Sequence, residues 1–257
     1  MSIACVIPAR LNSTRFPRKL LEKAGGKTVL ERTFEQAAKC SSIDHLFVAT
    51  DSEEIGEHVL QLGGQVIWTS PECQNGTERI SEALLKTPAL QQSSLIINIQ
   101  GDHPCTQPET LTAIVALLES DPVAVMSTAV TKIDTLTEYL SPHTVKCVFD
   151  KNQNALYFSR SPIPYCAQNQ PIQSYAHIGV YCYKTSFLQK HFSKETTSLQ
   201  KSEDLEQLKV LENGNRIKIA VVKEKILGID TPQDLEKLRE MLCPSNIFLS
   251  QVESSPP

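Results

Sequence analysis

The sequence of 257 residues lacks any apolar run near the roughly 18–20 residues that a membrane-spanning helix needs. Its first residues contain no basic segment and no cleavage site, so we expect no signal peptide. The formal net charge of −4 disfavours a general binder of nucleic acid or of membrane surfaces, which would carry a basic excess. We therefore expect a cytoplasmic protein with no nucleic-acid partner and no membrane partner.

The eight cysteines contain no CxxC pair, and they lack the ligand spacing of a zinc site. Several of them lie in apolar, strand-like runs, which is typical of reduced core thiols in a cytosolic protein. Two glycine-rich phosphate-binding motifs, GxxxxGK[ST] and GxGxxG, are also absent. Any phosphate that this chain binds must therefore be held by side chains more than by a glycine-rich loop.

Apolar runs that favour strands alternate with helical periodicity through the first 121 residues. We expect strands at residues 3–8, 45–51, 65–70 and 94–102, and helices at residues 28–38, 52–64, 76–86 and 107–121. This alternation predicts an α/β three-layer fold in which right-handed crossovers connect the strands of a mostly parallel sheet.

The pattern changes after Asp121, where strand-like pieces follow one another with few helices between them. We interpret residues 122–195 as an inserted or antiparallel portion that is used for dimerisation. Helical periodicity returns at residues 203–213. A strand at 217–224 precedes a helix within residues 228–242, which should start at Pro232 after Thr231. One domain should therefore span residues 1–243, followed by a polar tail, residues 244–257, whose last residues we expect to be frayed.

The loop after the first strand, in "IPARLNSTRFPRKLL", contains Arg10, Arg15, Arg18 and Lys19. Ligands of open α/β sheets bind outside the carboxyl ends of the strands, where this loop is expected. Arginine and lysine side chains donate to phosphate oxygens, so the loop favours a polyphosphate ligand. A basic loop exposed to solvent is the alternative.

Two aspartates follow other strands, Asp102 in "QGD" and Asp230 in "GID". Mg²⁺ is bound through one or two carboxylates together with substrate phosphates, so this pair suits a magnesium site beside the basic loop. An Asx-turn or a helix cap is the alternative for each. Thr77 in "NGTER" is either a helix start or a nucleotide contact, and His177 is either a core histidine or a functional one.

Eight stretches in this order resemble the family of 3-deoxy-manno-octulosonate (Kdo) cytidylyltransferases, the CMP-Kdo synthetases. They are "IPARLNSTRFPRKLL", "VATDSEEI", "NGTERISEAL", "IINIQGDHP", "ALYFSRSPIPY", "HIGVYCYK", "LEQLKVLENG" and "GIDTPQDLEKL", and the resemblance extends over essentially all of residues 2–242. The resemblance implies a Rossmann-like nucleotidyltransferase fold, a homodimer built through the middle segment, and dependence on Mg²⁺. The implied reaction converts CTP and Kdo into CMP-Kdo and pyrophosphate, for lipopolysaccharide biosynthesis.

The resemblance also implies roles for individual residues. The CTP phosphates should contact Arg10, Ser13, Arg15 and Lys19. The nucleotide should also lie beside Gln74, Gly76 and Thr77. The metal should be bound by Asp102 and Asp230, which act in catalysis with Arg10, Arg15 and Lys19. The sugar should be surrounded by Gln100, Arg160, His177, Tyr181, Glu203 and Gln207.

The sequence departs from the family pattern at Arg18, where glycine is common, and at His103, where glutamate is common. Three other functions remain open. A sialic acid cytidylyltransferase would have Gly-Ser-Lys where this chain has "NSTR", and a molybdopterin-type nucleotidyltransferase would have a glycine-rich loop. A non-catalytic nucleotide sensor would lack the metal-binding carboxylates, but both aspartates are present here.

Overall fold

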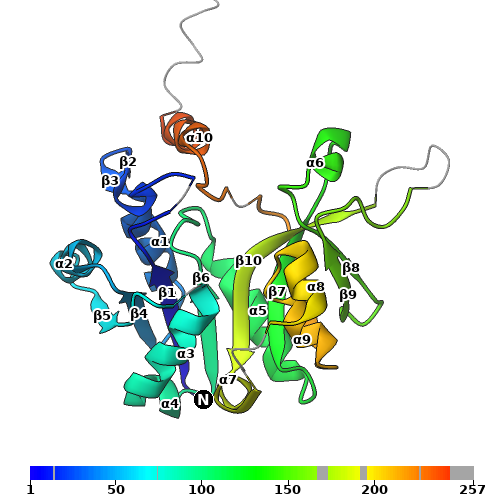
Figure 1. Cartoon of the computed structure of the whole chain (residues 1–257), viewed down its shortest axis with the longest axis horizontal. Helices are drawn as coiled ribbons and strands as arrows, with labels where there is room; N and C mark the ends of the chain where they lie inside the picture. The colour runs from blue at the N-terminus through cyan, green and yellow to red at the C-terminus, as the bar shows by residue number, and fades with distance from the viewer. Residues whose placement is uncertain (14, 74, 167–172, 192–195, 226, 244–257) are drawn as a thin grey trace, which may run out of the picture.

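The computed structural model describes residues 1–243 except 14, 74, 167–172, 192–195 and 226. The predicted tail, residues 244–257, lies outside the described residues. Within the described part, nine strands form one sheet (Figure 1). Its central order is β11 (Ile217–Val222), β7 (Met126–Lys132), β10 (Tyr175–Lys184), β6 (Leu95–Ile99), β1 (Ile3–Ala9), β4 (His45–Thr50) and β5 (Gln65–Trp68). Of these strands only β10 is antiparallel to its neighbours, so the predicted mixed, mostly parallel sheet is confirmed.

Helices cover both faces of the sheet (Figure 1). Residues Ile3, Cys5 and Ile7 of β1 pack toward one face, and Ala4 and Val6 pack toward the other. The first face is covered by α1 (Val29–Ala38), α2 (Glu53–Gln61), α5 (Pro108–Ser120) and α10 (Pro232–Leu242). The second face is covered by α3 (Gly76–Lys86), α4 (Pro88–Gln92), α7 (Thr185–His191) and α9 (Leu208–Glu212). Burial on both sides explains why these strands are continuous apolar runs, and the predicted three-layer fold is confirmed.

Side-chain caps fix the starts of the helices that were predicted from the sequence. Thr28 accepts a hydrogen bond from the backbone N–H of Glu31 at the start of α1, and Asn75 does the same for Glu78 in α3. Thr231 caps α10, whose first residue is a proline that needs no hydrogen-bond partner there. These caps place the first turns of α3 and α10 at the same edge of the sheet as the end of β1.

The strand-rich middle portion, predicted at residues 122–195, contributes to two regions. Strands β7 and β10 belong to the central sheet, whereas α6 (Leu136–Leu140), β8 (Lys146–Phe149) and β9 (Ala155–Ser159) project to one side of it (Figure 1). β8 pairs antiparallel with the first residues of β10 and with β9. The remaining short elements, η1 (Lys19–Leu21), β2 (Lys23–Ala24) and β3 (Lys27–Thr28), lie between β1 and α1.

The prediction of one helix over residues 203–213 is wrong. Helix α8 (Ser198–Glu203) ends there, Asp204 has a left-handed backbone with φ 53°, and α9 begins only at Leu208. The apolar spacing predicts a continuous helix, but the backbone turns at Asp204 between the two helices, and the adjacent Glu203 carboxylate accepts hydrogen bonds from Ser159 and Arg160. The turn residues, 204–207, reach toward the carboxyl ends of the central strands.

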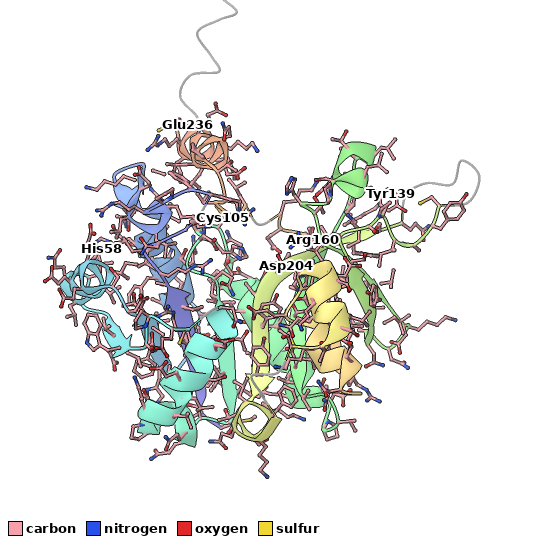
Figure 2. All side chains as sticks on the ribbon, viewed as in Figure 1. His58, Cys105, Tyr139, Arg160, Asp204 and Glu236 are labelled. Atoms are coloured by element: carbon pink, nitrogen blue, oxygen red, sulfur yellow. The ribbon has the colours of Figure 1, made fainter. Side chains whose placement is uncertain are left out.

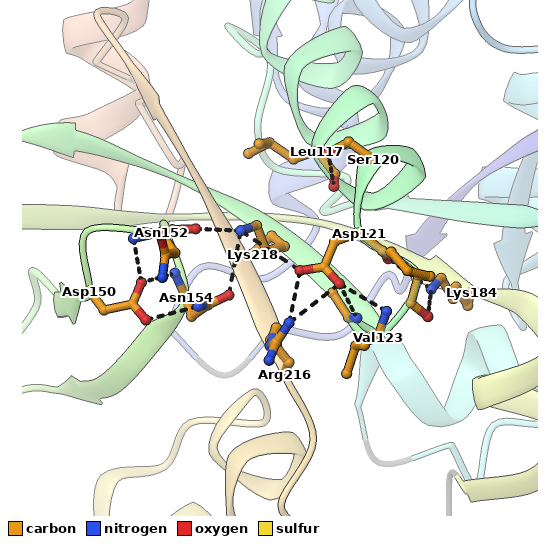
Figure 3. A network of polar contacts seen from close by, with 12 residues as sticks. Leu117, Ser120, Asp121, Val123, Asp150, Asn152, Asn154, Lys184, Arg216 and Lys218 are labelled. Carbon is orange, nitrogen blue, oxygen red and sulfur yellow. Dashed lines mark hydrogen bonds and ion pairs between the residues drawn. The ribbon is translucent and has the colours of Figure 1, made fainter.

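An ion-pair network fastens the β8–β9 turn to the far edge of the sheet (Figure 3). The Asp121 carboxylate, at the end of α5, accepts from the N–H groups of Val123 and Ala124 at 2.8 and 3.0 Å and pairs with Arg216 at 3.1 Å. Lys218 of β11 lies 3.8 Å from the same carboxylate and donates to the carbonyl of Asn152. The network therefore joins α5, β11 and the hairpin.

We expect Asp121→Asn to lower the free energy of unfolding at pH 7 by about 1–2 kcal/mol, because charged hydrogen bonds are lost. Hydrogen bonds from Ala124 and Val123 and the charge of Arg216 lower the pKa of Asp121 to about 2. Stability from a carboxyl with a depressed pKa is present above its unfolded pKa, about 4, and is lost as the pH falls toward 2. Urea unfolding at pH 7 and pH 3 measures this.

The difference between Asp121→Asn and wild type should shrink between pH 4 and pH 2. Asp134→Asn is the matched control, because its carboxylate pairs with Lys225 at the exposed surface. Equal losses in both variants, or a difference that does not depend on pH, would contradict this account of Asp121.

Candidate active site

A cavity of about 360 Å³ lies at the carboxyl ends of β1 and β6, where the strand-end rule predicted a site. Its volume falls within the roughly 300–1,000 Å³ of small-molecule sites. Eight of the predicted site residues line it: Arg10, Ser13, Arg15, Lys19, Gly76, Gln100, Asp102 and Asp230. The fold therefore brings the basic loop, the first turn of α3 and both aspartates around one space.

Lys19 joins the two aspartates. Its ammonium nitrogen donates to Oδ2 of Asp102 at 2.5 Å and to Oδ1 of Asp230 at 3.0 Å, and Arg15 lies 3.1 Å from the same Asp230 oxygen. Burial alone would raise the pKa of Asp102, but the charges of His103 and Lys19 outweigh it and hold that pKa below its usual value. Two carboxylate oxygens from distant parts of the chain thus converge on a single cation.

Backbone contacts hold these loops together. The N–H of Ile229 donates to the carbonyl of Asp102 at 2.9 Å, which ties the Asp230 loop to the Asp102 turn. At Gly101 an added Cβ would lie 3.2 Å from the carbonyl oxygen of Pro8, so glycine lets the β6 turn pass close to the end of β1. The close approach of β6 to β1 therefore fixes how far Asp102, after β6, lies from the basic loop, after β1.

The first turn of α3 forms another wall of the cavity, with Gly76 at its lining. Thr77 is buried and its hydroxyl donates to the carboxylate of Glu206. Gln74, the other residue predicted near the nucleotide, lies outside the described residues. The helix thus presents its N-terminal backbone to the space that the basic loop faces, an arrangement that suits an anion.

Three of the residues predicted to surround the sugar form a polar cluster beside the cavity. Nε2 of His177 lies 2.9 Å from the hydroxyl of Thr128, and its Nδ1 lies 3.5 Å from Nε2 of Gln207. The hydroxyl of Tyr181 donates to Oε1 of Gln207 at 3.5 Å. Burial lowers the pKa of His177 to about 3, so its imidazole is neutral near pH 7. Burial also raises the pKa of Tyr181, so this cluster is uncharged.

Of the remaining predicted sugar contacts, Gln100 lines the cavity, whereas Arg160 and Glu203 are outside its lining and are bonded to each other. Nε of Arg160 donates to the carbonyl of Glu203 at 2.8 Å, and its terminal nitrogens donate to the carbonyls of Pro142 and Asp204 at 3.2 and 3.3 Å. The Glu203 carboxylate accepts from the hydroxyl of Ser159. Direct contact of these two residues with a sugar stays a prediction.

The two departures from the family pattern occupy different environments. Arg18 has a left-handed backbone, φ 61°, which favours glycine, and its guanidinium pairs with Glu54 of α2 instead of facing the cavity. His103 lies beside the site, with Nε2 3.8 Å from Oδ1 of Asp102. A Cβ on Gly179 would come within 3.0 Å of the His103 ring, so the imidazole fills the space that this glycine leaves.

Sequence reasoning missed four polar residues that line the cavity: Asn75, Arg79, Asp204 and Glu206. Arg79 is buried and pairs with Asp51 at 2.9 Å. Asn75 and Arg79 flank the "GTE" of the quoted motif, and Glu206 directly precedes Gln207. Their closeness in sequence to predicted site residues is the one feature by which they could have been found. On a helix pattern such residues resemble an ordinary solvated face.

Comparison with known proteins agrees with this geometry. Residues 4–219 match the sequence profile of the cytidylyltransferase family. The 3-deoxy-manno-octulosonate cytidylyltransferase of Protochlamydia amoebophila (strain UWE25) is 45% identical over 247 residues, which is 95% of each chain. That of Chlamydia pneumoniae is 42% identical over 245 residues, again 95% of each. The chain belongs to the 3-deoxy-manno-octulosonate cytidylyltransferase family.

Solved structures extend the comparison. A CMP:2-keto-3-deoxy-manno-octonic acid synthetase complexed with CTP superposes with a TM-score of 0.89 and 32% identity, covering 95% of this chain and 99% of that one. HddC of Yersinia pseudotuberculosis, complexed with GMP-PN, shares the fold at a TM-score of 0.66 and 16% identity, covering 94% of this chain and 100% of that one. The predicted family, nucleotidyltransferase class and fold class are therefore confirmed. Across the described residues, each helix is too short or too polar to cross a membrane.

Proposed function

We propose that this site transfers CMP from CTP to the anomeric hydroxyl of Kdo, releasing pyrophosphate and forming CMP-Kdo for lipopolysaccharide biosynthesis. The observation that carries the proposal is the convergence of Asp102 and Asp230 on Lys19, at the wall of a cavity lined by a basic loop. Identity above 40% to curated family members over nearly the whole chain supports Kdo as the acceptor. The predicted cytoplasmic location is part of this proposal.

The triphosphate of CTP would lie against Arg10, Ser13, Arg15 and Lys19, with its nucleoside toward the first turn of α3. All four residues line the cavity, and Gly76 of α3 lines it as well. Arginine and lysine donors together with helix N–H groups suit phosphate oxygens. Gln74 and Thr77 are the remaining nucleotide contacts in this proposal. The Thr77 hydroxyl would be held beside the nucleotide by its hydrogen bond to Glu206.

Asp102 and Asp230 fit Mg²⁺ by the chemistry of their donors. Two carboxylate oxygens already converge on one cation, the Lys19 ammonium, and Mg²⁺ is typically held by one or two carboxylates plus substrate phosphates. When bound there, the ion would neutralise phosphate charge and act as a Lewis acid on the reacting oxygens. Lys19 would then turn from the carboxylates toward the phosphates.

In the proposed reaction the anomeric hydroxyl of Kdo attacks the α-phosphorus of CTP in line with the leaving pyrophosphate. Catalysis of such transfers rests mainly on positioning and on charge neutralisation. Arg10, Arg15 and Lys19 would stabilise the charge that grows on the pyrophosphate oxygens as the bond to the α-phosphorus breaks. The acceptor oxygen releases its proton to solvent water as it bonds to the α-phosphorus, and the mechanism needs no covalent enzyme intermediate.

The sugar would lie between Gln100 at the cavity wall and the uncharged cluster of His177, Tyr181 and Gln207. Kdo offers several hydroxyl groups, and a neutral imidazole, a phenol and two amides can both donate to and accept from them. The Kdo carboxylate would contact Arg160, whose side chain is 37% exposed. Glu203 would hold Arg160 in place and complete the sugar contacts.

The homodimer belongs to the same proposal. Leu136 and Leu140 of α6, Leu156 of β9 and Tyr165 are large apolar side chains exposed on the projecting part of the middle portion. Large apolar side chains that stay exposed on one part of a protein are typical of interfaces, so this part would cover its counterpart in a second copy. Sedimentation equilibrium of wild type and of Leu140→Asp, which we expect to shift toward monomer, tests this.

A pyrophosphate-release assay of CTP with different 2-keto sugar acids tests the function. We expect turnover with Kdo to exceed that with N-acetylneuraminate by at least about 100-fold, because a site whose polar groups pair with substrate hydroxyls rejects analogues that leave them unpaired. Efficient turnover of N-acetylneuraminate would identify a sialic acid cytidylyltransferase instead. CTP binding without pyrophosphate release from any acid would identify a sensor.

A further inference from the structure

We infer that Lys146, Ser159, Arg160 and Glu203, here called the Lys146 cluster, position the residue 204–207 turn and thereby the sugar end of the site. The inference rests on the proposed function, because it concerns where Glu206 and Gln207 are held relative to Kdo. The members of this cluster lie outside the cavity lining. Lys146 and Ser159 are therefore assigned as positioning residues, and neither is assigned a substrate contact.

Lys146 is the buried base of the cluster. Its side chain is fully enclosed, with 0% exposure, and its ammonium donates to the carbonyls of Ser141, Thr144 and Arg160 at 2.8, 2.7 and 2.5 Å. A buried ammonium is costly unless its hydrogens are paired. These three bonds fix the loop before β8 and the residue after β9 to one point, and Lys146 cannot reach a ligand in the cavity.

Glu203 connects that point to α8. Its carboxylate accepts from the Ser159 hydroxyl at 2.6 Å and from the Arg160 N–H at 2.8 Å, so both oxygens are used by the end of β9. Arg160 in turn donates to the carbonyls of Glu203 and Asp204. Figure 2 shows Arg160 and Asp204 next to each other at the end of α8. The last turn of the helix is thus bonded to the hairpin through side chains and backbone alike.

The backbone beyond Glu203 shows why this attachment matters. Asp204 has a left-handed backbone, φ 53°, a conformation that glycine favours and that other residues keep only where surrounding contacts hold it. Immediately after it, Glu206 accepts from Thr77, and Gln207 contacts His177 and Tyr181. If Glu203 were released from β9, the helix could continue through 204 and rotate both side chains away.

A purely structural cluster and a positioning cluster differ in what their loss does to the two substrates. The proposed phosphate contacts lie on the loop after β1, whereas the residue 204–207 turn contacts the His177 side. Small displacements of positioning groups lower rates by up to about 10²-fold. Loss of the Lys146 cluster should therefore weaken Kdo use far more than CTP use, whereas general destabilisation would affect both.

Ser159→Ala is the central variant, because Ser159 is 2% exposed and contributes a single hydroxyl to Glu203. We expect its KM for Kdo to rise about 10-fold while its KM for CTP stays within about 2-fold of wild type. Glu212→Gln is the matched control. Glu212 holds the other end of α8, accepting from Ser198, Leu199 and Gln200 at 2.9, 3.0 and 3.2 Å, and we expect it to leave both KM values within about 2-fold.

Hydrogen exchange of the unliganded protein separates this inference from the proposed function. The backbone N–H of Leu205 donates to the carbonyl of Gln200, and that of Leu208 donates to the carbonyl of Leu205. Both N–H groups should exchange about 10-fold faster in Ser159→Ala and at the wild-type rate in Glu212→Gln. Lys146→Met should act like Ser159→Ala, and where it fails to fold, Ser159→Ala alone decides. Unchanged exchange in Ser159→Ala, or an equal rise in both KM values, would overturn the inference. If exchange is faster in Ser159→Ala but the wild-type protein does not use Kdo, only the proposed function is overturned.

Discussion

Asp102→Asn and Asp230→Asn are each expected to lower kcat by about 10²–10³-fold while leaving the fold intact. An amide binds Mg²⁺ far less well than a carboxylate, and loss of one charge-stabilising group in such a site costs about that factor. The fold should survive because asparagine has nearly the same shape, and its amide oxygen can still accept from Lys19. A thermal unfolding temperature close to wild type would show this.

Two measurements make the result specific to the metal. Raised Mg²⁺ should recover part of the activity, and Mn²⁺ binding in the presence of CTP, followed by electron paramagnetic resonance, should weaken in both variants. Asp121→Asn is a matched control, because its carboxylate also pairs with an arginine but lies outside the cavity lining. Near-normal activity of Asp102→Asn at low Mg²⁺ would refute the metal assignment.

The sequence predicted the placement of these aspartates for a physical reason. Parallel strands end at one edge of a sheet, so the basic loop after β1 and Asp102 after β6 meet there. Asp230 lies in the loop beyond β11, and the hydrogen bond from Ile229 to Asp102 holds that loop at the same edge. The helix caps at Thr28, Asn75 and Thr231 are local signals, and each helix that follows one begins where the pattern indicated. The mostly parallel sheet, the basic loop and the Asp102–Asp230 pair could therefore be derived before any coordinates.

The residues that sequence reasoning missed depend on non-local contacts. Helical spacing through residues 203–213 hid the turn at Asp204, where Glu203 accepts a hydrogen bond from Ser159, 44 residues away in the chain. Glu206 lies within that turn and lines the cavity. Arg160 carries no local sign that its guanidinium donates to backbone carbonyls. Periodicity reports which face is apolar, and it cannot report such partners.

Lys19→Met is expected to change two measurements in opposite directions. Lys19 would stabilise charge on the leaving pyrophosphate, so the single-turnover rate at saturating CTP should fall by about 30- to 1,000-fold, or about 2–4 kcal/mol of transition-state stabilisation. In the protein without nucleotide, however, the same ammonium occupies the oxygens of Asp102 and Asp230 that a divalent ion would use. Removing it should therefore strengthen Mn²⁺ binding to the nucleotide-free protein severalfold.

Arg18→Ala is the matched control, because Arg18 is the adjacent cation but pairs with Glu54 of α2. It should leave both the single-turnover rate and Mn²⁺ affinity within about 2-fold of wild type, as expected for an exposed ion pair. A loss of rate in Lys19→Met with weaker Mn²⁺ binding would mean that Lys19 supports the metal site instead of competing with it. The competition of Lys19 with the metal and its catalytic role both follow from its position between the two aspartates. An unchanged single-turnover rate would therefore leave Lys19 only the role of a structural counter-ion to Asp102 and Asp230.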